Sequence, residues 1–66
     1  MYTRLGDLEP GSRFICPYEA AHRGTVHLWV LTADTAKNPD NRVILRLCDG
    51  ARSEDSKNTD VVKVLL

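Results

Sequence analysis

The chain has 66 residues, and its nine Lys plus Arg residues balance nine Asp plus Glu residues, so the formal net charge is zero. A chain of this length has room for one domain with a modest core, and we expect residues 1–66 to form it. Positively and negatively charged residues alternate along the sequence and do not form separate blocks. The protein therefore lacks the overall field that draws basic proteins to nucleic acid or to an anionic membrane surface.

No segment of the sequence looks like a membrane span or a signal peptide. No apolar run approaches the roughly 20 residues that cross a bilayer, and Met1-Tyr-Thr-Arg4 lacks the apolar stretch of a leader. We therefore expect a cytoplasmic protein. Its two cysteines, Cys16 and Cys48, are too few for a disulfide framework, so we expect small buried thiols, although a disulfide between them remains an alternative.

The first expected elements are a helical turn and a tight turn. Leu5 and Leu8 share one side of a short helical turn that would cover one end of the fold. Pro10 and Gly11 predict a type II β-turn, because proline sets φ for the second turn position and glycine accepts the positive φ of the third.

A strand is expected next, over residues 13–16. It would carry Phe14 and Cys16 on one face and end at Pro17, which lacks a backbone donor for the sheet. The segment from Pro17 to Gly24 is either one or two turns of helix or an irregular loop. Proline at a first helical position and glycine just past a helix end favour the helix.

The clearest strand covers residues 26–32, which are rich in β-branched and aromatic side chains. Its side chains alternate between two faces. One face carries Val26, Leu28 and Val30, and the other carries His27, Trp29 and Leu31. Because both faces are apolar, the strand would lie in the centre of a sheet or against a partner.

The rest of the chain alternates polar connections with short strands. In order, we expect an exposed loop at 33–41, a strand at 42–48, a strand at 51–53, a loop at 54–58 and a strand at 61–65. Asp49-Gly50 predicts a two-residue hairpin turn between the strands at 42–48 and 51–53.

Five short strands without a long helix predict an all-β protein, or a mainly β protein with one short helix. The pattern favours a five-stranded antiparallel barrel, SH3-like or OB-like. Closure of the barrel would remove the exposed strand edges that invite aggregation.

Most of the chain resembles a class of short β-rich proteins encoded by phages and other mobile elements. Their opening, GDLxxGxxF, matches residues 6–14, and the Trp29–Thr32 and Thr59–Leu65 segments also fit the class. Leu31 departs from it, since lysine is common there. The resemblance implies a bacterial host cell, and small phage proteins of this size include inhibitors of bacterial defence, such as anti-CRISPR proteins, which occupy a surface of a larger assembly.

Enzyme chemistry finds little support in the sequence. Cys16, His22, His27 and Cys48 supply atoms that bind zinc, but their spacing matches no common zinc motif. A thiol nucleophile with a histidine base would need a third group to orient the histidine, and none is evident. Because phosphate-binding loops and hydrolase motifs are also missing, we predict no catalytic residue, no metal and no cofactor.

The most suggestive surface surrounds Trp29. If the strands at 26–32 and 42–48 are neighbours, one face presents five residues: His27, Trp29, Leu31, Ile44 and Arg46. Since Trp and Arg are enriched in interface hot spots, we predict that these five bind a partner protein. The alternative is that this face packs beneath the helical turn near Ala20 and Ala21 and completes the core.

The predicted function is a small non-enzymatic module that occupies a surface of a host protein, with inhibition of a defence system such as CRISPR-Cas as its effect. Two alternatives stay open. In one, Arg42, Arg46 and Arg52 follow a nucleic-acid backbone while Trp29 stacks on a base. In the other, a homodimer covers the second apolar face of the strand at 26–32.

Overall fold

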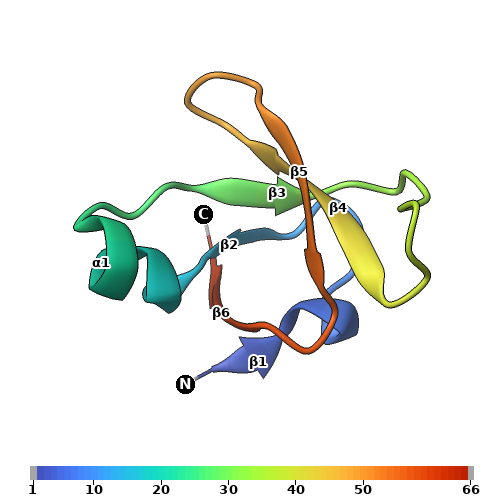
Figure 1. Cartoon of the computed structure of the whole chain (residues 1–66), viewed down its shortest axis with the longest axis horizontal. Coiled ribbons are helices and arrows are strands. Elements are labelled where there is room, and N and C mark those ends of the chain that lie inside the picture. Colours follow the sequence, from blue (N-terminus) through green and yellow to red (C-terminus); the bar gives the residue numbers. More distant parts are fainter. Residues whose placement is uncertain (1, 66) are drawn as a thin grey trace.

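The computed structural model describes residues 2–65, so Met1 and Leu66, the ends of the expected domain, lie outside it. One strongly bent antiparallel sheet dominates the fold, with a short helix at one end (Figure 1). The elements are β1 (Thr3–Arg4), the 3₁₀ helix η1 (Leu5–Asp7), β2 (Arg13–Ile15), α1 (Pro17–Arg23), β3 (Trp29–Leu31), β4 (Asn41–Arg46), β5 (Arg52–Ser56) and β6 (Asp60–Val64). Among residues 2–65, no helix has the length and apolar character needed to cross a membrane.

The expected mainly β class with one short helix is confirmed, whereas the closed five-stranded barrel, SH3-like or OB-like, is wrong. The strand order is β1-β6-β2-β3-β4-β5, which gives six strands with β1 and β5 at the two edges. Within residues 2–65 these two edges do not pair with each other. The β5 edge carries the sequence Arg-Ser-Glu-Asp-Ser, and charged side chains of this kind protect an open edge without closure.

The opening segment folds as its residues predict. Leu5 in η1 is fully buried, and Leu8 packs against the same core. At the following turn, the Ser12 N–H donates to the Glu9 carbonyl at 3.0 Å, and Gly11 has a φ of +91°. These features confirm the type II turn.

The next two elements are also confirmed. Phe14 and Cys16 point into the core, with exposed fractions of 0% and 1%. Pro17 begins α1, and Gly24 ends it with a φ of +72° and an N–H bond to the Ala20 carbonyl at 3.2 Å. The segment from Pro17 to Gly24 is therefore a helix and not an irregular loop, with proline at its start and a left-handed glycine at its end.

The β4–β5 hairpin is confirmed, but its turn is longer than two residues. The Arg46 N–H donates to the Ala51 carbonyl and the Gly50 N–H donates to the Arg46 carbonyl, both at 2.8 Å, so residues 47–50 form the turn. A two-residue type I′ turn needs positive φ at both central positions. Gly50 has a φ of +73°, but Asp49 does not lie in the positive region.

Three strands differ clearly from the sequence prediction. The strand expected at 42–48 is β4, which ends at Arg46 and leaves residues 47 and 48 in the turn. β3 covers only Trp29–Leu31, although the Leu28 carbonyl still accepts a bond from the Leu47 N–H at 3.0 Å. β5 extends to Ser56 and so includes three of the five residues of the expected 54–58 loop. An edge strand that faces water needs few apolar side chains, so its sequence looks like that of a loop.

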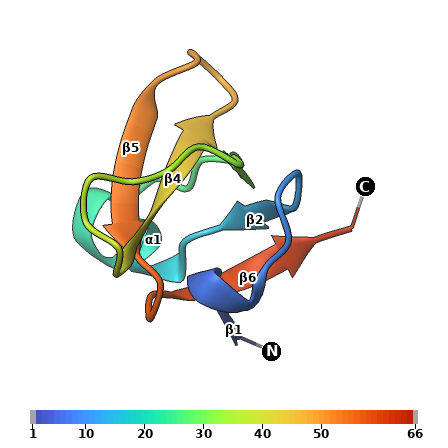
Figure 2. The ribbon, with the colours of Figure 1, turned by 90° about the vertical axis from the view of Figure 1, so that its right-hand side faces the viewer.

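The core fills the concave side of the bent sheet. Its buried members are Leu5, Phe14, Cys16, Trp29, Leu31, Ile44 and Val61. On the outside, the polar connection between β3 and β4 crosses beside β4 and β5 (Figure 2). This connection forms one wall of the site described next.

Candidate functional site

The five residues predicted to bind a partner do share one region, but most of them form core. Trp29, Leu31 and Ile44 are 6%, 3% and 2% exposed. The register pairs Trp29 with Arg46 and Leu31 with Ile44, as the expected neighbouring strands require. The expectation of an exposed apolar stripe is therefore wrong. In a chain this small, large apolar side chains are needed to fill the core.

Glu19 on α1 covers the indole of Trp29. The Trp29 Nε1–H donates to Glu19 Oε1 at 2.8 Å, and Glu19 is 2% exposed. The alternative interpretation, in which this face packs beneath α1 and completes the core, is the one that fits, although Ala20 and Ala21 themselves are exposed. No sequence pattern points to a buried Glu19, because a carboxylate in the first turn of a helix normally faces water.

Arg46 lies at the rim of the same cluster. Its guanidinium carbon is 5.7 Å from the centroid of the Trp29 ring. Arg46 Nε donates to Asp49 Oδ1 at 2.9 Å while Nη2 donates to Oδ2, a bidentate pair. Hydrogen bonds from Arg46, and then from the Ala51 N–H, lower the pKa of Asp49 to about 2. The Arg46 guanidinium is therefore already paired with a carboxylate of its own hairpin.

The two cysteines are free thiols in different environments. Cys16 is buried as expected, and burial, with a smaller effect of Glu19, raises its pKa to about 12. Cys48 is exposed, which corrects the expectation that both are buried. Its Sγ lies 3.8 Å from His27 Nδ1, while His22 is exposed on α1. Among residues 2–65, no three potential metal ligands lie close together.

We expect Cys48 to react with an aromatic disulfide reagent in the native protein while Cys16 stays protected. With a pKa of about 12, the Cys16 thiol is ionised in only about one molecule in 10⁴ at pH 8. A thiol titration should show one thiol reacting at once and the second only in denaturant. Cys48→Ser should abolish the rapid reaction, whereas Cys16→Ser should retain it. Rapid labelling of both thiols in folded protein would contradict this prediction.

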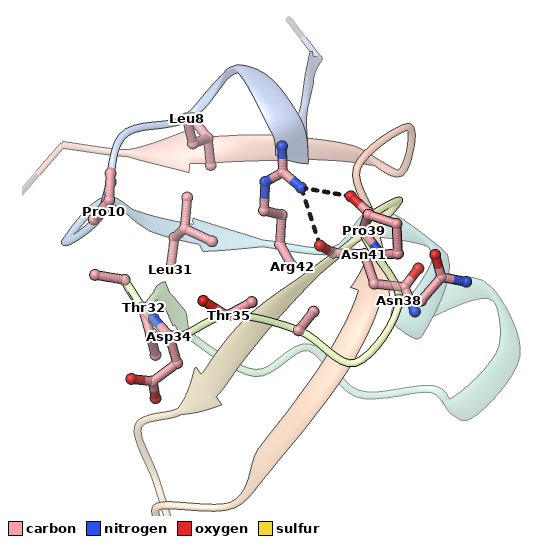
Figure 3. Close-up of a pocket in the computed structure, with 12 residues that line it drawn as sticks. Leu8, Pro10, Leu31, Thr32, Asp34, Thr35, Asn38, Pro39, Asn41 and Arg42 are labelled. Carbon is pink, nitrogen blue, oxygen red and sulfur yellow. Dashed lines mark hydrogen bonds between the residues drawn. The ribbon is translucent and has the colours of Figure 1, made fainter.

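A groove of about 290 Å³ opens between the β3–β4 connection and the turn that follows η1 (Figure 3). This volume is near the lower end of ligand sites, which span about 300–1,000 Å³. Leu8, Pro10 and Leu31 provide an apolar floor. Among the polar residues around it, Asp34 points outward in Figure 3, and Asn38 Oδ1 accepts from the Asp40 N–H at 2.9 Å. The lining comprises Leu8, Pro10, Leu31, Thr32, Ala33, Asp34, Thr35, Ala36, Asn38, Pro39, Asn41 and Arg42.

Two contacts with β5 fix the wall formed by the β3–β4 connection. The Asp34 carboxylate forms an ion pair with Arg52, and the Lys37 N–H donates to Glu54 Oε2 at 3.3 Å. The sequence predicted an exposed loop here, and most of its side chains are exposed. The contacts that position it join residues 17 and 18 positions apart, which local turn signals do not reveal.

Arg42 projects into this groove from β4. Its Nη1 donates to the Asn41 carbonyl at 3.0 Å and to the Pro39 carbonyl at 3.4 Å. Among residues 2–65, no carboxylate forms an ion pair with Arg42. From the sequence, Arg42 was expected only as a contact to a nucleic-acid backbone, because the groove exists only after the β3–β4 connection has packed.

The other two arginines of the nucleic-acid alternative are paired with carboxylates, Arg46 with Asp49 and Arg52 with Asp34. Trp29 is buried and presents no open face to a base. These contacts weaken the case for nucleic-acid binding. No protein-family model, curated protein or solved structure matches this chain, so the case for a function rests on the groove and the residues that line it.

Proposed function

We propose that the protein is a small non-enzymatic binding module that takes a short segment of a partner protein into the groove between Leu8 and Arg42. The observation that carries this proposal is the combination of an apolar floor with a hydrogen-bonding rim. Such a combination suits a peptide, whose side chains fill the floor while its backbone meets polar groups.

The anchored wall also supports this proposal. Because Asp34 and Lys37 contact groups on β5, this part of the rim is joined to the sheet before any partner arrives. A preformed site loses less conformational entropy on binding than a loop that must first become ordered. A small groove on such a frame is suited to one short segment of a larger partner.

The mode of action that we propose is occupancy of a surface of a bacterial host protein or assembly. Its support is the phage-like GDLxxGxxF opening at residues 6–14. The module would act in the host cytoplasm and inhibit its target by covering it, as inhibitors of CRISPR-Cas and other defence systems do.

Filling the groove should abolish partner capture. Ala33 is exposed and lines the groove, so Ala33→Trp places an indole there with little effect on the core. Immobilised protein would be incubated with bacterial lysates, and the retained proteins would be measured by mass spectrometry. We expect the partner signal to fall at least about tenfold, corresponding to a loss of about 1.4 kcal/mol in binding.

The matched control is Ala21→Trp on the exposed face of α1, away from the groove lining. This variant should capture the same partner as the unaltered protein. Equal capture by the Ala33→Trp variant, or no specific capture by the unaltered protein, would argue against the proposal.

A further inference from the structure

We infer that the groove selects an acidic peptide segment, in which the side-chain carboxylate of an internal Asp or Glu binds Arg42 next to an apolar side chain on the floor. This inference rests on the proposed function, because it names the chemistry of the segment that the groove would take. It is carried by the geometry of the Arg42 guanidinium and by the charge of its surroundings.

The guanidinium of Arg42 is oriented but not neutralised. Two backbone carbonyls, of Pro39 and Asn41, both accept from Nη1. Among residues 2–65, Nε and Nη2 of Arg42 have no hydrogen-bond acceptor from the protein. Figure 3 shows this edge of the guanidinium turned toward the Leu8 side of the groove. The bonds to the carbonyls hold the side chain in place and leave its free edge facing the groove.

A second arginine of this protein, Arg46, binds a carboxylate through the edge that is free in Arg42. Arg46 uses Nε and Nη2 to hold both oxygens of Asp49, with an Nε–Oδ1 distance of 2.9 Å. A planar guanidinium matches the two oxygens of a carboxylate, and such bidentate pairs are stronger and more specific than a single hydrogen bond. The free edge of Arg42 would complete the same arrangement with a carboxylate from the partner.

The other charges near the groove leave Arg42 as the dominant one. Asp34 is the acidic residue of the lining, and its carboxylate is paired with Arg52. In Figure 3 the Asp34 side chain points away from Arg42. The groove therefore presents one unneutralised positive charge, which favours a negatively charged ligand.

The placement of Arg42 favours an internal acidic residue over a free chain end. Leu8 and Pro10 line the groove on one side of Arg42, and Asn38 and Pro39 line it on the other (Figure 3). A peptide that follows the lining passes Arg42 midway along its path. An apolar side chain of the peptide would then contact Leu8, next to the residue that supplies the carboxylate.

The test is selection of displayed random heptapeptides on the immobilised protein, followed by anisotropy measurements with labelled, C-terminally amidated peptides. Enriched peptides should carry Asp or Glu at one fixed position beside an apolar residue. Changing that acid to its amide should weaken binding at least about tenfold. Arg42→Gln should have a similar effect, whereas Arg23→Gln removes the same charge from the exposed end of α1, outside the groove lining, and should retain binding.

Two sets of outcomes separate this inference from the proposed function. In the first set, the peptides bind the unaltered protein but not the Ala33→Trp variant, and they either lack a fixed acidic residue or still bind when it is changed to its amide. This result would overturn the carboxylate inference and leave the groove as a binding site. A requirement for a free C-terminal carboxylate would also overturn it. No enrichment, or peptides indifferent to Ala33→Trp, would overturn the groove itself. The amide-substituted peptides keep the test valid even if Arg42→Gln weakens the fold.

Discussion

Trp29→Phe is expected to lower the free energy of unfolding by about 3 kcal/mol. Phenylalanine keeps a buried aromatic ring but removes the Nε1–H that donates to Glu19 at 2.8 Å. Glu19 would retain a buried carboxylate without that donor, which costs about 1–3 kcal/mol and more if the group is charged. The smaller ring also leaves a cavity and weakens the contact with Arg46. Because a chain of this size is stable by only a few kcal/mol, the variant should be largely unfolded at moderate urea concentration.

Urea unfolding followed by far-ultraviolet circular dichroism measures this effect, because Trp29 is the single tryptophan and its fluorescence disappears with it. Adding Glu19→Met should restore about 1–2 kcal/mol, since it replaces the unpartnered carboxylate with an apolar side chain of similar length. Equal instability of the single and double variants would show that the Trp29–Glu19 bond is not what holds α1 on the sheet.

The Trp29 cluster shows what alternation along a strand does and does not determine. The period of two correctly placed Trp29, Leu31 and Ile44 on a shared face. It did not determine whether that face is inside or outside, because both faces of the strand are apolar. That choice depends on where α1 packs, and α1 places Glu19, a residue type that is rarely buried, against Trp29.

Local turn chemistry predicted the Pro10-Gly11 turn and the ends of α1, but neither the length of the β4–β5 turn nor the groove. Pro10-Gly11 and the Pro17–Gly24 helix follow from residues that are neighbours in the sequence. One wall of the groove is joined to β5 by the Asp34–Arg52 ion pair, which links residues 18 positions apart. The sixth strand was missed for a related reason, since the two-residue strand β1 is too short to show the apolar alternation used to recognise strands. The polar strand β5 was expected, but only over residues 51–53.

Gly6→Ala is expected to lower the free energy of unfolding by about 2 kcal/mol, through overpacking between η1 and the β5–β6 turn. A Cβ at residue 6 would lie 2.8 Å from Lys57 Cβ and 3.1 Å from the Lys57 carbonyl oxygen. The backbone cannot retreat freely, because the Gly6 N–H donates to that same carbonyl at 2.8 Å. Relieving the overlap must move η1, and with it Leu5, which is fully buried.

The adjacent variant Asp7→Ala is the matched control, because Asp7 is exposed on the same turn and its truncation should change stability by less than about 0.5 kcal/mol. Urea unfolding of both variants should separate close packing from helical preference, since alanine favours a helix at either position. Lys57→Gly removes the nearest atom, so combining it with Gly6→Ala should cost less than the sum of the two single changes. Strict additivity would argue against the overlap. If the double variant loses less stability than the sum of the two single variants, Gly6 is needed because η1 and the β5–β6 turn approach each other closely there. The glycine of the GDL opening would then have a role in folding that is independent of any partner.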